Sequence, residues 1–242
     1  MISKKIQQNI ELLQGFYRFL YLWKFLEKYI KQHDISESAI DFPISTSDKK
    51  NFVMKWAVVK KILSDIYAHP DKKNIFWYMV ELNSFKGIFS LTREMMETQD
   101  IFQSFLEKKL KDKAIAFEQI IRFFRNVLNH IETADVKIKL DDFIKQKDYL
   151  SKGKHISKIE FTMKYADYFV EWTGSKEYGL DIVIDFHALK EWQKIFDIIP
   201  LHQVYLLAEF CFNLSEIFRT TMLPSPKKPS SKHYRKSSRK RN

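Results

Sequence analysis

The chain has 242 residues, of which 45% are hydrophobic and 15% aromatic, which is enough apolar material for a folded core and excludes a disordered protein. Five glycines and six prolines are too few for a turn-rich β architecture, so the composition favours long helices. The formal net charge is +11, but residues 224–242 hold eight lysines and arginines and no acid, which leaves 11 − 8 = +3 for the rest of the chain.

The cysteine content and the charge pattern predict the compartment. A single cysteine, Cys211, cannot form an internal disulfide, and no Cys/His cluster resembles a zinc site, so we expect a reducing environment. Charged residues interrupt the apolar N-terminal stretch, which argues against a signal peptide. No stretch approaches the roughly 18 uncharged residues that span a bilayer. We therefore expect a soluble, cytoplasmic protein without a membrane partner.

Helical periodicity dominates the first half of the chain. The predicted elements are a helix from Ile2 to about Gln32, a loop over 34–43, a helix with Ser47 or Asp48 as its N-cap that ends before Pro70, a helix over about 73–97 and a short charged helix over 101–112.

The second half mixes helices with strands. The predicted elements are a helix over 113–132, a β-hairpin over about 157–186 with its turn between Gly174 and Gly179, a helix over about 188–196, a break at Pro200 and a last helix over 201–221. The predicted fold class is therefore mainly α, a helical bundle with a small inserted β-hairpin. Residues 1–222 are expected to form one helical domain, and 223–242, rich in Pro, Ser and basic residues, a disordered flexible tail.

The helix around Phe124 is the most informative segment. At 100° per residue, a stripe of apolar residues falls on its core side: Phe117, Ile120, Ile121, Phe124, Val127, Leu128 and Ile131. The opposite side carries Arg122, Asn126 and Asn129, with Arg125 and His130 at its two margins. These side chains can bind anions, donate directed hydrogen bonds and exchange protons near neutral pH.

The run from Arg125 to His130, Arg-Asn-Val-Leu-Asn-His, resembles the signature of the HEPN superfamily. In that signature four to six residues stand between an Arg and a His, and a small polar residue directly follows the Arg. The resemblance covers about twenty residues. It implies a helical bundle that dimerises so that two motifs face each other, and that cleaves RNA without a metal or another cofactor. Abortive-infection proteins, toxins and other antiviral effectors are well represented in this superfamily.

The resemblance also implies roles for individual residues. His130 would act as general acid or base on the ribose 2′-hydroxyl or the leaving 5′-oxygen. Arg125 would hold the scissile phosphate, and Asn126 would orient neighbouring groups. Arg122 and Asn129 are candidate substrate-binding residues on the same face. The expected products are 2′,3′-cyclic phosphate and 5′-hydroxyl ends.

The implied partners are an RNA substrate, a second copy of the chain and a restraining partner such as an antitoxin or a regulatory protein or RNA. Toxins of the superfamily that are silenced by a nucleotidyltransferase commonly carry a Tyr two residues after the His. Glu132 occupies that position here, which argues against regulation by that route.

Other readings of the same helix stay open. Its polar face is also typical of a solvated surface on which Glu118 and Arg122 form an i,i+4 pair. A HEPN-type fold can bind RNA without cutting it, as a regulatory module that uses its basic tail, or it can serve only as a structural dimerisation partner.

For the other candidate residues we favour structural roles over functional ones. Asp185, His187 and Glu191 are more typical of caps and surface residues than of a metal site. His202 is expected near the cap of the last helix, and Cys211 as a small buried residue. The helical spacing of the aromatic residues, including Phe123 and Phe124, indicates core packing. The tail can attract RNA phosphates through counterion release, or act as a solubility tail or an acidic-partner contact.

Overall fold

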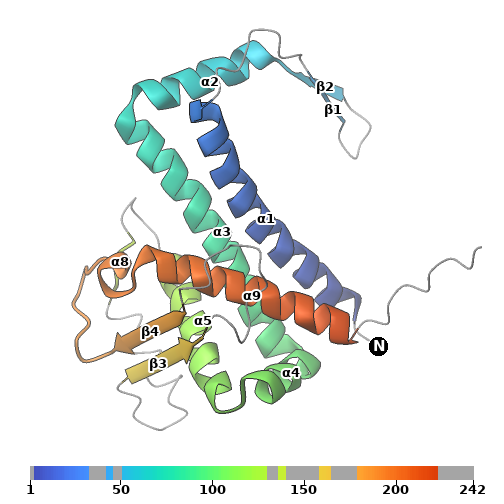
Figure 1. Cartoon of the computed structure of the whole chain (residues 1–242), viewed down its shortest axis with the longest axis vertical. Coiled ribbons are helices and arrows are strands. Elements are labelled where there is room, and N and C mark those ends of the chain that lie inside the picture. Colours follow the sequence, from blue (N-terminus) through green and yellow to red (C-terminus); the bar gives the residue numbers. More distant parts are fainter. Residues whose placement is uncertain are drawn as a thin grey trace, which may run out of the picture.

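Helices make up most of the described chain, arranged as shown in Figure 1. The computed structural model describes residues 3–32, 42–45, 51–129, 136–139, 158–164 and 179–222. The helices are α1 (Lys4–Gln32), α2 (Trp56–Ala68), α3 (Pro70–Thr98), α4 (Asp100–Leu110), the 3-10 turn η1 (Lys111–Lys113), α5 (Ala114–Asn129), α8 (Ile195–Ile198) and α9 (Leu201–Met222). Two antiparallel strand pairs accompany them, β1 (Phe42–Ser45) with β2 (Asn51–Met54), and β3 (Lys158–Met163) with β4 (Leu180–Asp185).

Two long helices, α1 and α3, lie side by side, and α9 crosses them (Figure 1). The ring of Tyr17 in α1 stacks on Phe212 in α9 with 4.4 Å between centroids. Ion pairs join α1 to α3 at both ends of their contact, Lys5 to Glu94 at 2.8 Å and Lys24 to Glu81. The ring contact thus joins α1 to α9, and the two ion pairs join α1 to α3.

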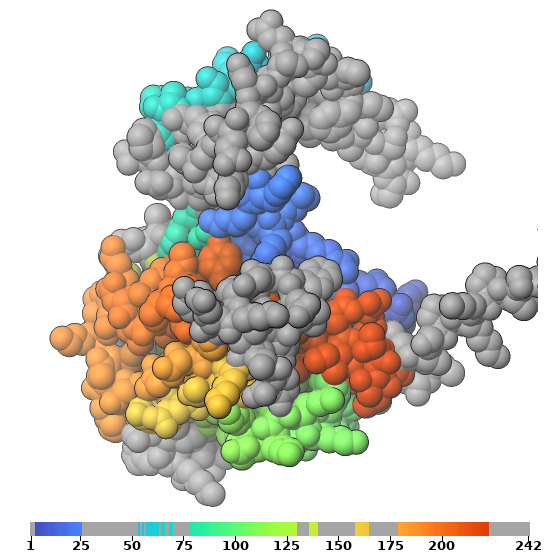
Figure 2. All heavy atoms as spheres, in the orientation of Figure 1, coloured from blue at the N-terminus to red at the C-terminus, as the bar shows by residue number. Residues whose placement is uncertain are grey.

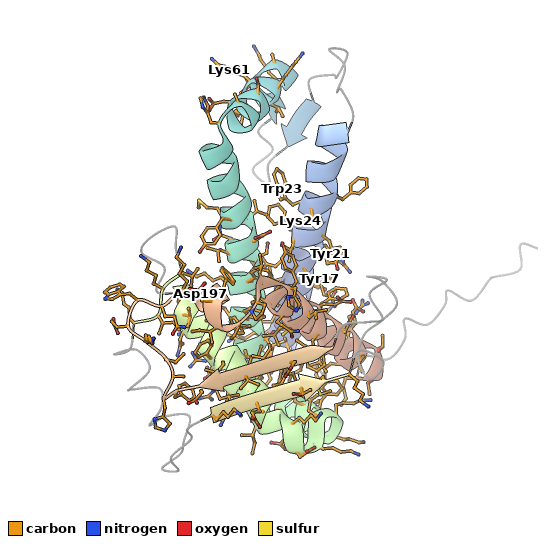
Figure 3. All side chains as sticks on the ribbon, turned by 60° about the vertical axis from the view of Figure 1, so that its left-hand side comes forward. Tyr17, Tyr21, Trp23, Lys24, Lys61 and Asp197 are labelled. Atoms are coloured by element: carbon orange, nitrogen blue, oxygen red, sulfur yellow. The ribbon has the colours of Figure 1, made fainter. Side chains whose placement is uncertain are left out.

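A partly buried tyrosine extends these contacts to the third helix. The hydroxyl of Tyr205 in α9 donates to Glu81 Oε1 at 2.5 Å, so one carboxylate of α3 accepts from both α1 and α9. Lys24 lies on α1 in line with Tyr17 and Tyr21 (Figure 3). Burying the Glu81 carboxylate is tolerated because both partners are hydrogen-bonded to it.

The β3–β4 sheet has one buried face. Phe161 pairs with Ile182, and the buried positions of both strands alternate with exposed ones, as expected for a sheet covered on one side. The exposed side chains are polar or charged except Val183. Phe161 lies between Phe117 of α5 and Phe210 of α9, at 5.6 and 5.7 Å between centroids. The sheet therefore closes the core beneath α5 and α9.

The predicted apolar stripe of α5 is confirmed. Every stripe residue within the described chain is buried: Phe117, Ile120, Ile121, Phe124, Val127 and Leu128. Phe123 is buried as well and packs edge-on against Phe124. The ring of Phe124 meets Phe89 of α3 at 5.2 Å, so α5 is held against α3 with its polar face beside that helix.

Two sequence predictions are wrong. The helix expected to begin at Ser47 or Asp48 begins at Trp56, because Asn51–Met54 pair as a strand with Phe42–Ser45. The first two residues of that partner strand were expected in the loop over 34–43. The helix expected over 188–196 is reduced to Ile195–Ile198.

The backbone of the segment before Ile195 is engaged elsewhere. Residues 192–195 exchange backbone hydrogen bonds with residues 136–138, and this pairing takes the place of helical bonds. The remaining predicted helices are confirmed with small shifts of their ends. The predicted hairpin is confirmed as the antiparallel pair β3–β4, while its predicted turn lies outside the described residues.

The basic tail after residue 222 also lies outside the described residues. Among the helices that are described, none combines the length and the apolar character needed to cross a bilayer.

Candidate functional site

The polar face of α5 lies against the C-terminal half of α3. At this contact the side chain of Arg93 in α3 donates from Nη1 to Asn126 Oδ1 at 3.0 Å. Arg125 donates from its own Nη1 to the same oxygen, also at 3.0 Å. Two guanidinium groups thus converge on one neutral amide oxygen, which brings two positive charges together without a carboxylate between them.

Two carboxylates hold the flanks of this arrangement. Glu97 accepts from Arg93 Nε at 3.0 Å and lies 3.4 Å from Arg122 Nη2. Glu118, one turn before Arg122 in α5, pairs with the same Nη2 at 2.8 Å. The i,i+4 pair expected for a solvated helix face is therefore present, but it belongs to a larger network that joins α3 to α5.

We call Arg93, Arg122, Arg125, Asn126, Glu97 and Glu118 the arginine cluster. Three arginines and two glutamates give it a formal charge of 3 − 2 = +1. The side chains of Arg93 and Arg122 are 18% and 13% exposed, so these two charges are largely shielded from water. Charges in such a position interact more strongly than charges on an open surface.

The surroundings of Arg125 disfavour its positive charge. Partial burial lowers its pKa, the positive charge of Arg93 lowers that pKa further, and the carboxylate of Glu97 opposes both effects. The guanidinium stays charged, because an arginine does not lose its proton in proteins. An additional anion bound here would relieve the repulsion between the two arginines.

The chemistry available to the arginine cluster is anion binding. A guanidinium has five N–H donors in a planar fork that matches the oxygens of a phosphate. Nη1 of Arg93 and Nη1 of Arg125 are both directed at the neutral oxygen of Asn126, which leaves their positive charge uncancelled at that point. A phosphodiester is a ligand of suitable charge and geometry.

Four of the five predicted site residues are described, and three of them belong to the arginine cluster: Arg122, Arg125 and Asn126. Asn129 is partly exposed at the last position of α5, about one turn beyond Asn126. His130 lies outside the described residues, as does Glu132.

Sequence reasoning missed Arg93. It lies 33 residues before Asn126, in a helix that carried no motif, and only the packing of Phe89 on Phe124 brings it to the site. The sequence feature that could have indicated Arg93 is its position four residues before Glu97, because an i,i+4 pair of opposite charges is typical of a charged helix face.

The other candidate positions take structural roles. Asp185 accepts from the backbone N–H of His187 at 2.9 Å, a local turn of the kind that aspartate stabilises. His202 is exposed in the first turn of α9, beside Gln203. Cys211 is 2% exposed, which confirms it as a buried residue. Within the described ranges no group of three or more His, Cys, Asp and Glu side chains is placed to hold a metal ion.

Comparison of this chain with models of protein families, with curated proteins and with solved structures found no match in any of the three. The arginine cluster therefore has to be interpreted from its own chemistry.

Proposed function

We propose that this protein is a metal-independent endoribonuclease of the HEPN type, which works as a homodimer in toxin-type growth control or antiviral defence. The observation that carries the proposal is the convergence of Arg93 and Arg125 on Asn126 Oδ1. Such a pair of guanidiniums suits a scissile phosphate, whose negative charge increases in the transition state of cleavage.

In the proposed reaction the ribose 2′-oxygen attacks the adjacent phosphorus and the bond from phosphorus to the 5′-oxygen breaks. The proton of the 2′-hydroxyl goes to a general base, and a general acid supplies a proton to the leaving 5′-oxygen. The products are a 2′,3′-cyclic phosphate and a 5′-hydroxyl. No oxidant, metal or water is consumed in this step.

His130 is proposed for the proton transfers, on the strength of its position in the motif. Four residues separate it from Arg125, and in the helical geometry expected from the sequence this spacing corresponds to about 140° around one helix. One copy would then present the two groups at opposite margins of its polar face. Two copies related by a two-fold axis would supply two arginines and two histidines to a shared site. The monomer is then expected to be inactive.

The decisive experiment is cleavage of a mixed RNA pool in EDTA, with analysis of the new ends. Wild type is compared with Arg125→Ala, Arg93→Ala and His130→Ala. Arg219→Ala is the matched control, because Arg219 is an arginine ion-paired to Glu216 on α9, outside the arginine cluster. Cyclic-phosphate ends made by wild type and the control, and lost in the other three variants, are the expected result.

Two outcomes contradict the proposal. Equal cleavage by all variants shows that another site, or a contaminant, cuts the RNA. RNA binding by wild type without any cleavage, when binding is lost on removal of residues 224–242, favours the alternative of a non-catalytic module that binds through its basic tail.

A further inference from the structure

A tryptophan is displayed to solvent by a strained turn before α8. Trp192 is 57% exposed and has a backbone φ of 63°. A bulky residue rarely adopts this left-handed conformation, which is favoured by glycine and asparagine. Such strain persists only where the surrounding structure imposes it, and it is concentrated at functional sites.

The surrounding structure does impose it. The N–H of Trp192 donates to Ile138 O at 2.8 Å, and the N–H of Ile138 donates to Gln193 O at 2.9 Å. The side chain of Gln193 closes the turn by accepting from the N–H of Lys190 at 3.1 Å. The segment 136–139, which supports the turn, is itself anchored, because the N–H of Val136 donates to the hydroxyl of Tyr78 in α3 at 2.9 Å.

The two segments that form the Trp192 turn are rich in lysine. Residues 136–139 and 190–197 together contain four lysines and two acids, and Lys137 and Lys194 face each other across the bridge between the two segments. The Nζ atom of Lys139 lies 5.9 Å from the centre of the Trp192 ring. An exposed aromatic ring within a positive surface is the pattern that binds single-stranded nucleic acid, since bases stack on the ring and phosphates contact the cations.

This surface belongs to the body of the molecule, at one edge of it. The segment around α8 forms part of the orange surface in Figure 2. In Figure 3 Lys61 of α2 lies at the top of the molecule, whereas Asp197 of α8 lies lower, in the part that carries the β3–β4 sheet.

The Trp192 surface and the arginine cluster are placed along one helix. Tyr78 anchors the segment 136–139 and lies in α3, as does Arg93. The two residues are 15 positions apart, which corresponds to about 22 Å along the helix axis and about 60° around it. α5 runs antiparallel to this part of α3, since Arg122 is near Glu97 and Asn126 is near Arg93. α5 therefore runs from the level of Glu97 towards the part of α3 that holds Tyr78, whose hydroxyl accepts from the N–H of Val136.

We propose that Trp192, with Lys137, Lys139, Lys190 and Lys194, is a binding platform for single-stranded RNA. One base stacks on the indole and the neighbouring phosphates contact the lysines, while another part of the strand occupies the arginine cluster. The choice of RNA over DNA as the natural ligand rests on the proposed function; the stacking platform itself does not. It would hold nucleotides away from the cut and would not take part in the chemistry.

The test uses the full-length protein and a labelled single-stranded DNA about 12 nucleotides long, which lacks the 2′-hydroxyl and cannot be cleaved by the proposed route. Binding is followed by fluorescence anisotropy at about 0.15 M salt. Trp192→Ala is expected to weaken binding by about 5- to 150-fold, the range reported by alanine substitution at stacking residues. Trp192→Phe keeps a ring and should retain most of the affinity.

Phe19→Ala is the matched control, because Phe19 is an aromatic residue of α1 that is also half exposed. Its removal should leave binding unchanged. The intrinsic fluorescence provides a second readout: DNA is expected to quench the fluorescence of the wild type, and this quenching should be lost in Trp192→Phe, although four other tryptophans remain. Thermal unfolding checks that each variant is folded.

The outcomes separate this inference from the nuclease. Affinity and quenching that do not depend on residue 192 overturn the platform, even if RNA is cleaved normally. Binding that requires an aromatic residue at 192, in a protein that cleaves no RNA, supports the platform while the proposed nuclease fails.

Discussion

Arg93 of α3 and Asn126 of α5 are joined by a hydrogen bond of 3.0 Å, and Arg125 shares the same acceptor oxygen. An amide accepts both bonds without neutralising either arginine. An aspartate in its place would pair with them and cancel the positive charge. The amide thus keeps the two guanidiniums together while leaving their charge available to a ligand.

The first prediction follows from this contact. Asn126→Asp lowers the formal charge of the arginine cluster from +1 to 0, so RNA affinity should fall by about tenfold, or ~1.4 kcal/mol. The free energy of unfolding should rise by about 1 kcal/mol, because two hydrogen bonds become fully charge-assisted. Filter binding and urea unfolding measure the two effects. Asn83→Asp, an exposed position of α3, is the control; an equal loss of affinity there would point to a general charge effect.

The second prediction concerns the residue that sequence reasoning missed. Arg93→Gln removes a guanidinium from the phosphate-binding pair, and RNA cleavage should fall by more than about tenfold. Arg93→Lys should recover only part of the activity, since an ammonium lacks the planar fork. Single-turnover cleavage assays compare the three proteins. Full activity in Arg93→Gln would remove Arg93 from the proposed site.

The third prediction contrasts two helical glycines. A Cβ atom on Gly87 of α3 would lie 2.6 Å from the ring of Phe16 in α1, whereas a Cβ on Gly15 would meet nothing within 4 Å. Gly87→Ala should therefore destabilise the protein by about 1–3 kcal/mol through overpacking. Gly15→Ala should stabilise it by about 0.5–1 kcal/mol, because alanine favours the helix. Changes of the same sign in urea unfolding would contradict this packing of α1 on α3.

The fourth prediction is a pH dependence. Burial raises the pKa of the Cys211 thiol to about 12, and a hydrogen bond with Thr92 opposes the shift only in part. The folded-state pKa is above the unfolded value of about 8.5, so the stabilisation is complete below pH 8.5 and is lost as the pH rises towards 12. Cys211→Ala should remove this component.

The measurement is the free energy of unfolding between about pH 8 and 10, where one such thiol contributes a slope of at most about 1.4 kcal/mol per pH unit. Wild type should show a steeper decline than Cys211→Ala. The thiol should also react with a disulfide reagent only after unfolding. Rapid reaction in the native protein would show that Cys211 is accessible.

Much of the fold was predictable because its signals are local. The stripe from Phe117 to Leu128 follows the helical period, and the alternation in Leu180–Asp185 follows the strand period. Each can be recognised within one element, since the side-chain direction depends on position along that element. The same local arithmetic placed Arg122, Arg125 and Asn126 on one face.

Where a local signal competed with a distant partner, the prediction was wrong. Ser47 and Asp48 are typical N-caps, yet the residues after them form β2 because Phe42–Ser45 offers a strand to pair with. The segment before Ile195 carries helical periodicity, yet its backbone bonds go to residues 136–138.

The sequence by itself determined which face of α5 is apolar and which polar residues lie opposite, because helical geometry relates neighbours in the chain. Only the tertiary structure decided that this polar face meets Arg93 and Glu97, and that Trp192 is held outward in a left-handed turn. Both depend on contacts between residues far apart in the chain, which form when α3 packs on α5 and when residues 136–139 pair with the turn before α8. The periodicity of the sequence predicts which side of a single helix or strand is apolar. Which other element that side contacts depends on how the elements pack.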